Sequence, residues 1–311
     1  MARLRGPSTG RALLLAALAD LAFGEPPNRL HPVAWFGALV AAVERRAPGG
    51  SPARQLLYGA GLAAGGVGLA AGLSWAAARV AERGAWARLL ADTVLLKSAF
   101  SLRMLAGEAA RVQRLLEAGD LPAARRALRA LVSRDPSGLD ERLAAAAAIE
   151  SVAENLSDSV VAPLLYAVLG GPGAALAYRA VNTLDAMVGY RGQYEYLGKA
   201  AARLDDLLNL APSRLAALLL VATAGLLGFD VRRAWTTAWR DHGRTASPNA
   251  GWPMAAMAGA LGRRLEKVDH YTLGDGPAPQ PADIARALRL YTGAAALALL
   301  LALTLECCRG G

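Results

Sequence analysis

Long apolar stretches dominate the pattern of hydrophobic and polar positions along this chain. The clearest of them are Gln55–Val80, Arg214–Gly228 and Leu288–Leu305. They reach or approach the roughly 20 apolar residues that a helix needs to cross a bilayer. Weaker candidates, several of them interrupted by charges, are Ala12–Phe23, Leu89–Leu105, Leu143–Leu169 and Ala174–Val188. Because no strand-like alternation stands out, the pattern predicts an all-α, polytopic membrane helix bundle.

The pattern changes between residues 106 and 142, where charged residues become frequent. Apolar residues recur there at helical spacing in two blocks separated by "GDLP", and a polar loop "SRDPSGLD" follows. This predicts two short amphipathic helices. Seven Arg residues favour a cytoplasmic location for the segment. We therefore expect a single integral membrane domain over residues 1–311, multi-pass in the cell inner (cytoplasmic) membrane, with 106–142 as a cytoplasmic insertion.

Composition supports a membrane protein. Hydrophobic residues make up 54% of the chain and charged residues only 19%, against about 25% charged in ordinary soluble domains. The net charge of +9 is explained by basic cytoplasmic loops or by an anionic substrate. Nucleic acid is not expected as a partner, since no basic patch is interleaved with aromatic residues. The adjacent Cys307 and Cys308 define no disulfide framework and no metal site.

One apolar segment, "AIESVAENLSDSVVAP", carries a stripe of polar side chains. Glu150, Glu154 and Asp158 follow one another at intervals of four residues, so on a helix they share one face with Asn155 beside them. No Lys or Arg occurs between Arg142 and Arg179. Clustered carboxylates without a cation suggest Mg²⁺ held through oxygen ligands and waters. The alternative is the solvated face of an ordinary amphipathic helix.

Two further segments offer acids and amides close to apolar helices. "YRAVNTLDAMVGY" places Asn182 and Asp185 three residues apart on one helix face. "ARLDDLLNLAPSR" adds Asp205 and Asp206. These sets make a shared polar site more plausible, although helix capping and surface ion pairs would also explain the two aspartates.

Near the N-terminus, "DLAFGEPPNRLHPV" is dense in turn-forming residues and brings Asp20, Glu25 and His31 into an irregular segment. Such backbone is tolerated at membrane depth only where protein or a cavity covers it. His31 is either a structural histidine or a functional one. Lys97, within the apolar run "LLKSAFSLRML", either extends to the membrane interface or meets an anion.

Two loops have features of anion sites. Arg134, beside the hydroxyl of Ser133 and next to Asp135, suits a phosphate. Ser247 and Asn249 precede an Ala/Gly-rich helix, whose first N–H groups could face an anion, although a plain interhelical turn would look the same. The sequence contains no standard P-loop.

Taken as successive blocks, these segments resemble a known family. "DLAFGEPPNRLHPV", "KSAFSLR", "SRDPSGLDE", "AAIESVAENLSDSVVAPLLY", "VNTLDAMVGY", "ARLDDLLNLAPSRL" and "SPNAGWPMAAMAGALG" look like the blocks of the CobD/CbiB family of adenosylcobinamide-phosphate synthases, in family order. The resemblance extends from about Asp20 to the last apolar span.

The resemblance implies an ATP- and Mg²⁺-dependent amide ligase of cobalamin biosynthesis. Its substrates would be the corrinoid adenosylcobyric acid and (R)-1-aminopropan-2-ol O-phosphate, or aminopropanol itself. Residues expected to act in catalysis are Glu150, Glu154, Asp158, Lys97 and His31, of which the first three would hold the metal. Residues expected to bind substrate are Asp20, Glu25, Ser133, Arg134, Asp135, Asn155, Asn182, Asp185, Tyr190, Arg203, Asp205, Asp206, Ser247 and Asn249. The lipid bilayer is the other expected partner, and homo-oligomerisation is left open.

Two other classes remain as alternatives. A membrane transporter would also place carboxylates and broken helices inside the membrane, but the inverted repeat common in such folds is not visible. In a purely structural membrane protein, the polar stripes would join helices to one another.

Overall fold

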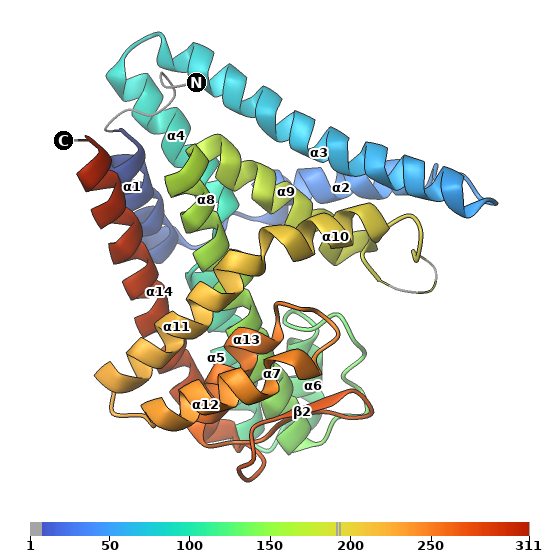
Figure 1. Ribbon diagram of the computed structural model, residues 1–311, viewed down its shortest axis with the longest axis vertical. Helices are drawn as coiled ribbons and strands as arrows, with labels where there is room; N and C mark the ends of the chain where they lie inside the picture. The colour runs from blue at the N-terminus through green and yellow to red at the C-terminus, as the bar shows by residue number, and fades with distance from the viewer. Residues whose placement is uncertain (1–7, 191, 193, 311) are drawn as a thin grey trace. The chain divides into compact units, whose positions relative to one another are not determined.

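The computed structural model describes residues 8–190, 192 and 194–310 as a predominantly helical chain (Figure 1). Its contacts divide the chain into two compact units. The first unit comprises the described residues within Met1–Ser101, Ala162–Leu208 and Leu301–Gly311. The second comprises Leu102–Val161 and Asn209–Leu300, and therefore contains the predicted 106–142 insertion. The organisation as a single membrane domain stays a prediction.

The first unit is built around α9. Its elements are α1 (Ser8–Phe23), the 3₁₀ turn η2 (Asn28–Leu30), α2 (Pro32–Glu44), α3 (Pro52–Ala81), α4 (Ala85–Ala99), α8 (Ala162–Gly170), α9 (Pro172–Val188) and α10 (Lys199–Leu208). Helix α9 packs against α2, α3, α4, α8 and α10, while α1 packs against α4. Val40, Ala63, Leu184 and Ala201 form part of the apolar core.

Small residues allow α3 to approach its neighbours closely. A Cβ atom at Gly59 would overlap the carbonyl oxygen of Leu197, whereas one at Gly61 would meet nothing within 4 Å. Leu197 lies in the turn before α10, so Gly59 leaves room on α3 for the backbone of this turn.

The second unit is built around α13. Its elements are α5 (Arg103–Glu117), α6 (Leu121–Leu128), α7 (Glu141–Leu156), the π-helical η3 (Ser157–Val161), α11 (Leu210–Leu226), α12 (Val231–Asp241), the 3₁₀ turn η4 (His242–Arg244), α13 (Gly251–Leu261), β1 (Leu265–Lys267), β2 (Tyr271–Leu273) and α14 (Pro281–Gly310), which ends in the first unit. Every residue of α13 is buried, and this helix packs against α7, α11 and α12.

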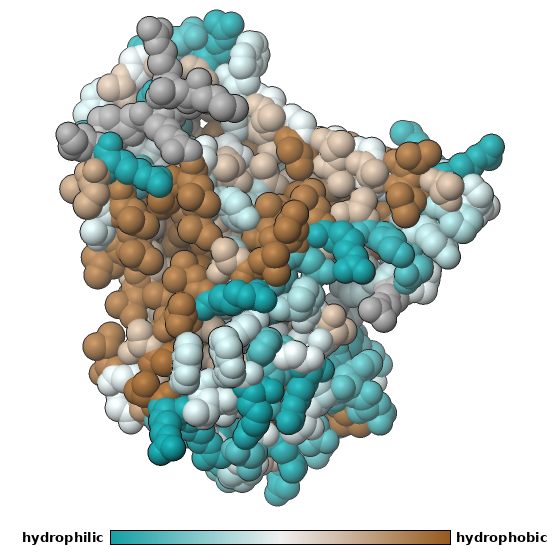
Figure 2. Space-filling view, in the orientation of Figure 1, coloured by the Kyte–Doolittle hydropathy of each residue, from teal (hydrophilic) through white to brown (hydrophobic). Residues whose placement is uncertain are grey.

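Within the described residues, three helical segments are long and apolar enough to cross a membrane: Pro52–Ala81, Glu141–Gly170 and Pro281–Arg309. A fourth is the pair Lys199–Leu208 and Leu210–Leu226, if its two helices, bent by 47°, form one span. Apolar side chains gather along α14 on the left of Figure 2. The all-α class and the membrane character predicted from the sequence are therefore confirmed.

Two details of the predicted pattern were wrong. Leu89–Leu105 is not one helix, because the chain is extended at Phe100 (φ −129°, ψ 158°) between α4 and α5. A small antiparallel hairpin was also missed, in which Leu265 pairs with Leu273. Strands of three residues are too short for period-two alternation to show in the sequence. In contrast, the two amphipathic helices predicted around "GDLP" are confirmed as α5 and α6.

Candidate functional site

In the second unit, α7 carries a glutamate into the protein interior. Asp140 caps the start of the helix, because its Oδ1 accepts a hydrogen bond of 2.8 Å from the backbone N–H of Leu143. Residues 144–148 are all alanine and all buried, so neighbouring elements pack closely around the helix. Glu150 follows on the same helix and is only 5% exposed.

The contacts of Glu150 engage only one of its two carboxylate oxygens among the described residues. Arg134, from the polar loop before α7, places Nη2 3.5 Å from Glu150 Oε2. The other carboxylate oxygen, Oε1, is buried and has no hydrogen-bond partner among the described residues. Leaving a buried polar atom unsatisfied costs about 1–3 kcal/mol. Glu150 is therefore an unusual group that a ligand or ion could satisfy.

Tyr271 in β2 belongs to the same neighbourhood and was not anticipated from the sequence. Its burial raises its pKa, and the nearby carboxylates of Glu150 and Glu154 raise it further. Lys267 in β1 also lies close enough for its positive charge to interact with the carboxylate of Glu150. Both residues come from the hairpin that the hydrophobic pattern did not reveal, so no sequence signal pointed to them.

Only part of the predicted polar stripe lies on a regular α-helix. Ser151 Oγ donates to the carbonyl of Leu131 at 2.7 Å, and the Asn155 amide donates to the carbonyl of Ser151 at 3.0 Å. The chain then widens into the π-helical turn η3, which interrupts the regular four-residue spacing at Asp158. No group of three or more His, Cys, Asp and Glu side chains in the described ranges is arranged to hold a metal ion. The structure thus does not assemble the stripe into a three-carboxylate metal site.

Of the loop before α7, only Arg134 reaches the buried glutamate. Ser133 and Asp135 are exposed. Asp135 accepts a hydrogen bond of 2.6 Å from the hydroxyl of Ser137, and the hydrogen bonds from this residue lower the Asp135 pKa. Asp135 therefore shapes the turn that presents Arg134.

The loop before α13 is held by its own polar groups. Ser247 Oγ accepts hydrogen bonds from the backbone N–H groups of Asn249 and Ala250 at 3.2 and 3.4 Å. Asn249 is buried, and its Oδ1 accepts from Ser213 at 3.3 Å and Arg214 at 3.2 Å. Both predicted residues thus make internal contacts, and Arg214 is a further basic residue that sequence reasoning did not select.

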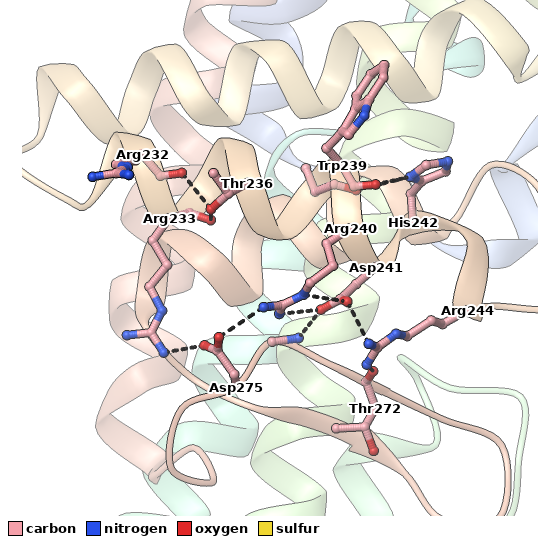
Figure 3. A network of polar contacts seen from close by, with 12 residues as sticks. Arg232, Arg233, Thr236, Trp239, Arg240, Asp241, His242, Arg244, Thr272 and Asp275 are labelled. Atoms are coloured by element: carbon pink, nitrogen blue, oxygen red, sulfur yellow. Dashed lines mark hydrogen bonds and ion pairs between the residues drawn. The ribbon is translucent and has the colours of Figure 1, made fainter.

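A network around Asp241 fixes the hairpin (Figure 3). Asp241 is fully buried and accepts hydrogen bonds from Arg240 at 2.8 Å and from the backbone N–H of Gly274 at 2.8 Å. Arg244 approaches its other oxygen at 3.1 Å. Burial alone would raise the Asp241 pKa, but the Arg240 hydrogen bond and these other contacts outweigh it and lower the pKa. Since Gly274 directly follows β2, this network positions the strand that carries Tyr271.

The first unit gathers four of the predicted residues into a charge cluster. Lys97 Nζ lies 2.9 Å from Asp20 Oδ1 and 3.0 Å from Glu25 Oε1. His31 Nε2 lies 2.8 Å from the other oxygen of Glu25. Burial would raise the Glu25 pKa, but the hydrogen bonds and the Lys97 charge prevail and lower it to about 2. The backbone N–H of Val33 donates to His31 Nδ1, so a neutral His31 carries its proton on Nε2 and donates it to Glu25.

The remaining predicted residues of the first unit lie on α9, on α10 and in the segment between them. The Asn182 amide donates to Asp205 at 3.2 Å and accepts from Arg179 at 3.2 Å. Asp185 is half-buried one turn further along α9. Two predicted residues, Tyr190 and Arg203, are exposed, and Asp206 is half-buried. The structure therefore brings Asn182 and Asp205 together.

Comparison with known proteins gives consistent results. A model of the family described as CobD/Cbib protein matches residues 13–291. A protein of Dehalococcoides mccartyi named cobalamin biosynthesis protein CobD is 45% identical over 267 residues, covering 84% of this chain and 85% of the relative. Proteins with the same name from Geobacter metallireducens and Citrobacter koseri are 42% and 39% identical, each covering at least 94% of this chain and 95% of the relative. No solved structure matches the chain.

Proposed function

Because the chain belongs to the CobD/CbiB family, we propose that it is a membrane enzyme that forms an amide bond in cobalamin biosynthesis. The acid substrate is adenosylcobyric acid, and the amine is (R)-1-aminopropan-2-ol O-phosphate or aminopropanol. The names of the relatives support the pathway, and the long apolar helices support a multi-pass location in the inner membrane.

The chemistry requires activation, because a carboxylate is a poor acyl donor. In the proposed sequence, the carboxylate of the corrinoid attacks the γ-phosphorus of ATP, giving an acyl phosphate and ADP. The amine nitrogen then attacks the acyl carbon, the carbon–oxygen bond to phosphate breaks, and inorganic phosphate leaves. The nitrogen loses one proton to a base. The protein must therefore hold phosphate groups and accept a proton.

The observation that carries our choice of site is Glu150, a buried carboxylate whose Oε1 has no hydrogen-bond partner among the described residues, with Arg134 at 3.5 Å and Tyr271 and Lys267 close by. Arg134 would bind a phosphate oxygen through its forked guanidinium. Glu150 or Glu154 would accept the proton of the amine, and the hydroxyl of Tyr271 would donate a hydrogen bond to a substrate oxygen. Each group comes from the second unit.

Mg²⁺ would suit this site if only one or two of its ligands come from the protein. It is commonly held by one or two carboxylates together with substrate phosphates and waters. Glu150 would supply the protein ligand through Oε1, which leaves Glu154 to accept the proton of the amine. When bound, the ion would neutralise phosphate charge.

The test is reconstitution of the purified protein in lipid nanodiscs with adenosylcobyric acid, ATP, Mg²⁺ and each amine separately. The expected result is a corrinoid product with the mass of the amide, together with ADP, formed by the wild-type protein and lost in Glu150→Gln. Absence of the amide product with both amines would refute the proposal.

A carrier is the second candidate, favoured by the break at Asn209 between the apolar helices α10 and α11, since broken helices line many transport sites. Thermal stability separates the two functions, because a ligand at a hundred times its Kd adds roughly 2.7 kcal/mol. Stabilisation by adenosylcobyric acid and the amine favours the enzyme, whereas stabilisation by an inorganic ion alone favours the carrier.

A further inference from the structure

Helix α12 leaves an apolar stripe uncovered. Val231, Trp235 and Trp239 are spaced four residues apart and are 42%, 46% and 62% exposed. The two tryptophan rings stack with centroids 5.9 Å apart. The opposite side of the helix is buried and includes Ala234 and Ala238. In Figure 3, Trp239 points away from the polar network around Asp241.

A basic residue lies directly beside this stripe. Arg232 follows Val231 on the helix and is exposed, whereas Arg233 and Arg240 extend to Asp275 on the side of the polar network. A helix with Trp on one side and Arg on the next is suited to lie in a membrane interface, where Trp prefers the headgroup level and Arg meets lipid phosphates.

The stripe is continuous with segments that are long and apolar enough for a membrane. Helix α12 follows α11, half of the bent candidate span, after a turn of four residues. At the end of α11, Leu226 is 72% exposed and Leu227 is exposed as well. An exposed apolar helix end followed by an amphipathic helix is the arrangement expected where a chain leaves the hydrocarbon region.

A basic pocket of about 390 Å³ opens at the same turn. It is lined by Phe229 and Arg233, by the end of α13, and by Arg286 and Arg289 near the start of α14, another candidate span. The guanidinium groups of Arg286 and Arg289 lie 5.4 and 5.7 Å from the centre of the Phe229 ring. Asp230 is the acidic residue of the lining, and its Oδ1 accepts the backbone N–H of Arg233.

The arginines of this region carry charge that local acids do not fully balance. Arg233 pairs with Asp275 at 2.6 Å, and Arg286 pairs with Asp283 at 2.8 Å. In the part of the chain that the structure describes, Arg232 and Arg289 have no carboxylate within 4.0 Å. Two arginines without a carboxylate partner among the described residues, close to an apolar stripe, favour the binding of an anion that also carries hydrocarbon chains.

We propose that this surface binds an anionic phospholipid. The phosphate of the headgroup enters the pocket and meets Arg286 and Arg289, while Val231, Trp235 and Trp239 contact the boundary between headgroups and acyl chains. Basic pockets beside membrane helices are typical sites for such headgroups. Helix α12 then lies along the membrane surface. This inference does not depend on the reaction proposed above.

Arg289→Gln provides the cleanest test, because it removes a pocket cation without breaking an ion pair. We would titrate the detergent-solubilised protein with short-chain phosphatidylglycerol, short-chain phosphatidylcholine and inorganic phosphate, and follow the melting temperature. The expected result is stabilisation by phosphatidylglycerol alone. Its apparent Kd should rise about fivefold in Arg289→Gln and roughly thirtyfold in Arg232→Gln/Arg289→Gln, since each interfacial Arg contributes about 1 kcal/mol.

Arg126→Gln is the matched control, because Arg126 is also exposed and also lacks a carboxylate partner among the described residues, but lies on α6. Its Kd should equal that of the wild type. Equal stabilisation by both lipids would overturn the proposal. Equal stabilisation by inorganic phosphate, dependent on Arg289, would identify a free-phosphate site and overturn the lipid assignment. If Arg289→Gln melts early without lipid, Arg232→Gln tests the exposed cation beside the stripe, outside the pocket, where a rise in Kd of about fivefold is likewise expected.

The tryptophan stripe has its own readout. In nanodiscs that contain phosphatidylglycerol brominated near the headgroup, Trp235 and Trp239 should be quenched. Trp235→Phe/Trp239→Phe should therefore reduce the quenched part of the emission, whereas Trp252→Phe, which removes a buried ring, should not. Unchanged quenching in the double variant would contradict contact between α12 and lipid.

Discussion

The two units hold their buried carboxylates in different ways. In the first unit, Lys97 contacts both Asp20 and Glu25 at about the distance of a good ion pair, 2.9 and 3.0 Å, and His31 covers the remaining side of Glu25. In the second unit, Glu150 has Arg134 at 3.5 Å, and its Oε1 has no hydrogen-bond partner in the part of the chain that the structure describes. In the first cluster, which we call closed, the charged groups are paired with one another at 3.0 Å or less. In the second, which we call open, Glu150 Oε1 has no partner among the residues that the structure describes.

The difference separates two uses of the same residue types. In a closed cluster the charges neutralise one another, and removing one of them leaves a buried charge without its partner. An open one carries an unsatisfied group, which is typical of a site completed by substrate. We therefore favour the region around Glu150 for the chemistry and the cluster around Lys97 for stability, although the sequence suggested a catalytic Lys97.

Lys97→Met should have the largest effect. It removes the cation shared by two buried acids, and breaking a buried pair costs about 3–5 kcal/mol. The measurement is unfolding of the detergent-solubilised protein. Lys199→Met is the control, because the pair between Lys199 and Glu195 is exposed and 3.8 Å long, so the change should be within about 1 kcal/mol. Equal stability of the two variants would show that the cluster is not structural.

The pH dependence of unfolding should report Glu25. Its pKa is about 2 in the folded protein and 4.5 without the cluster, which corresponds to roughly 3 kcal/mol. Because the folded pKa is the lower one, this stability is fully present above pH 4.5 and is lost as the pH falls toward 2. Glu25→Gln should flatten the stability curve in that window. An unchanged curve would show that the cluster does not lower the Glu25 pKa.

Glu150→Gln and Glu154→Gln should reduce activity without unfolding the protein. Each keeps the shape of the side chain and removes its charge, and we expect a loss of at least about a hundredfold, or roughly 2.7 kcal/mol of transition-state stabilisation. The assay is steady-state formation of the cobinamide product. Glu141→Gln, an exposed residue at the start of the same helix, should keep its rate. Near-normal rates for both site variants would move the chemistry elsewhere.

Tyr271→Phe should have the smallest effect, a loss of about tenfold if its hydroxyl donates one hydrogen bond to the substrate. The melting temperature should stay close to that of the wild type, because the ring keeps its packing. The exposed Tyr196 supplies a control in Tyr196→Phe, for which the rate should not change. An unaltered rate in Tyr271→Phe would leave the hairpin a purely structural role.

The sequence by itself determined the elements whose signal is local. The apolar stretches at Gln55–Val80 and Leu288–Leu305 lie within α3 and α14, because the length of an apolar run directly reflects the thickness of a bilayer. The amphipathic pair α5 and α6 followed from helical periodicity and a turn at "GDLP". The ordered blocks also identified the family.

Only the tertiary structure decided which charges meet. Lys97 lies far from Asp20 along the chain, and Tyr271 lies more than a hundred residues from Glu150, so no periodicity could connect them. The π-helical turn at Ser157 changed the spacing that had placed Asp158 in one stripe with Glu150. Helical period and span length are properties of neighbouring residues, whereas the saturation of a buried carboxylate depends on packing between distant segments. For that reason the candidate acids were visible in the sequence, but the difference between a closed and an open cluster was not.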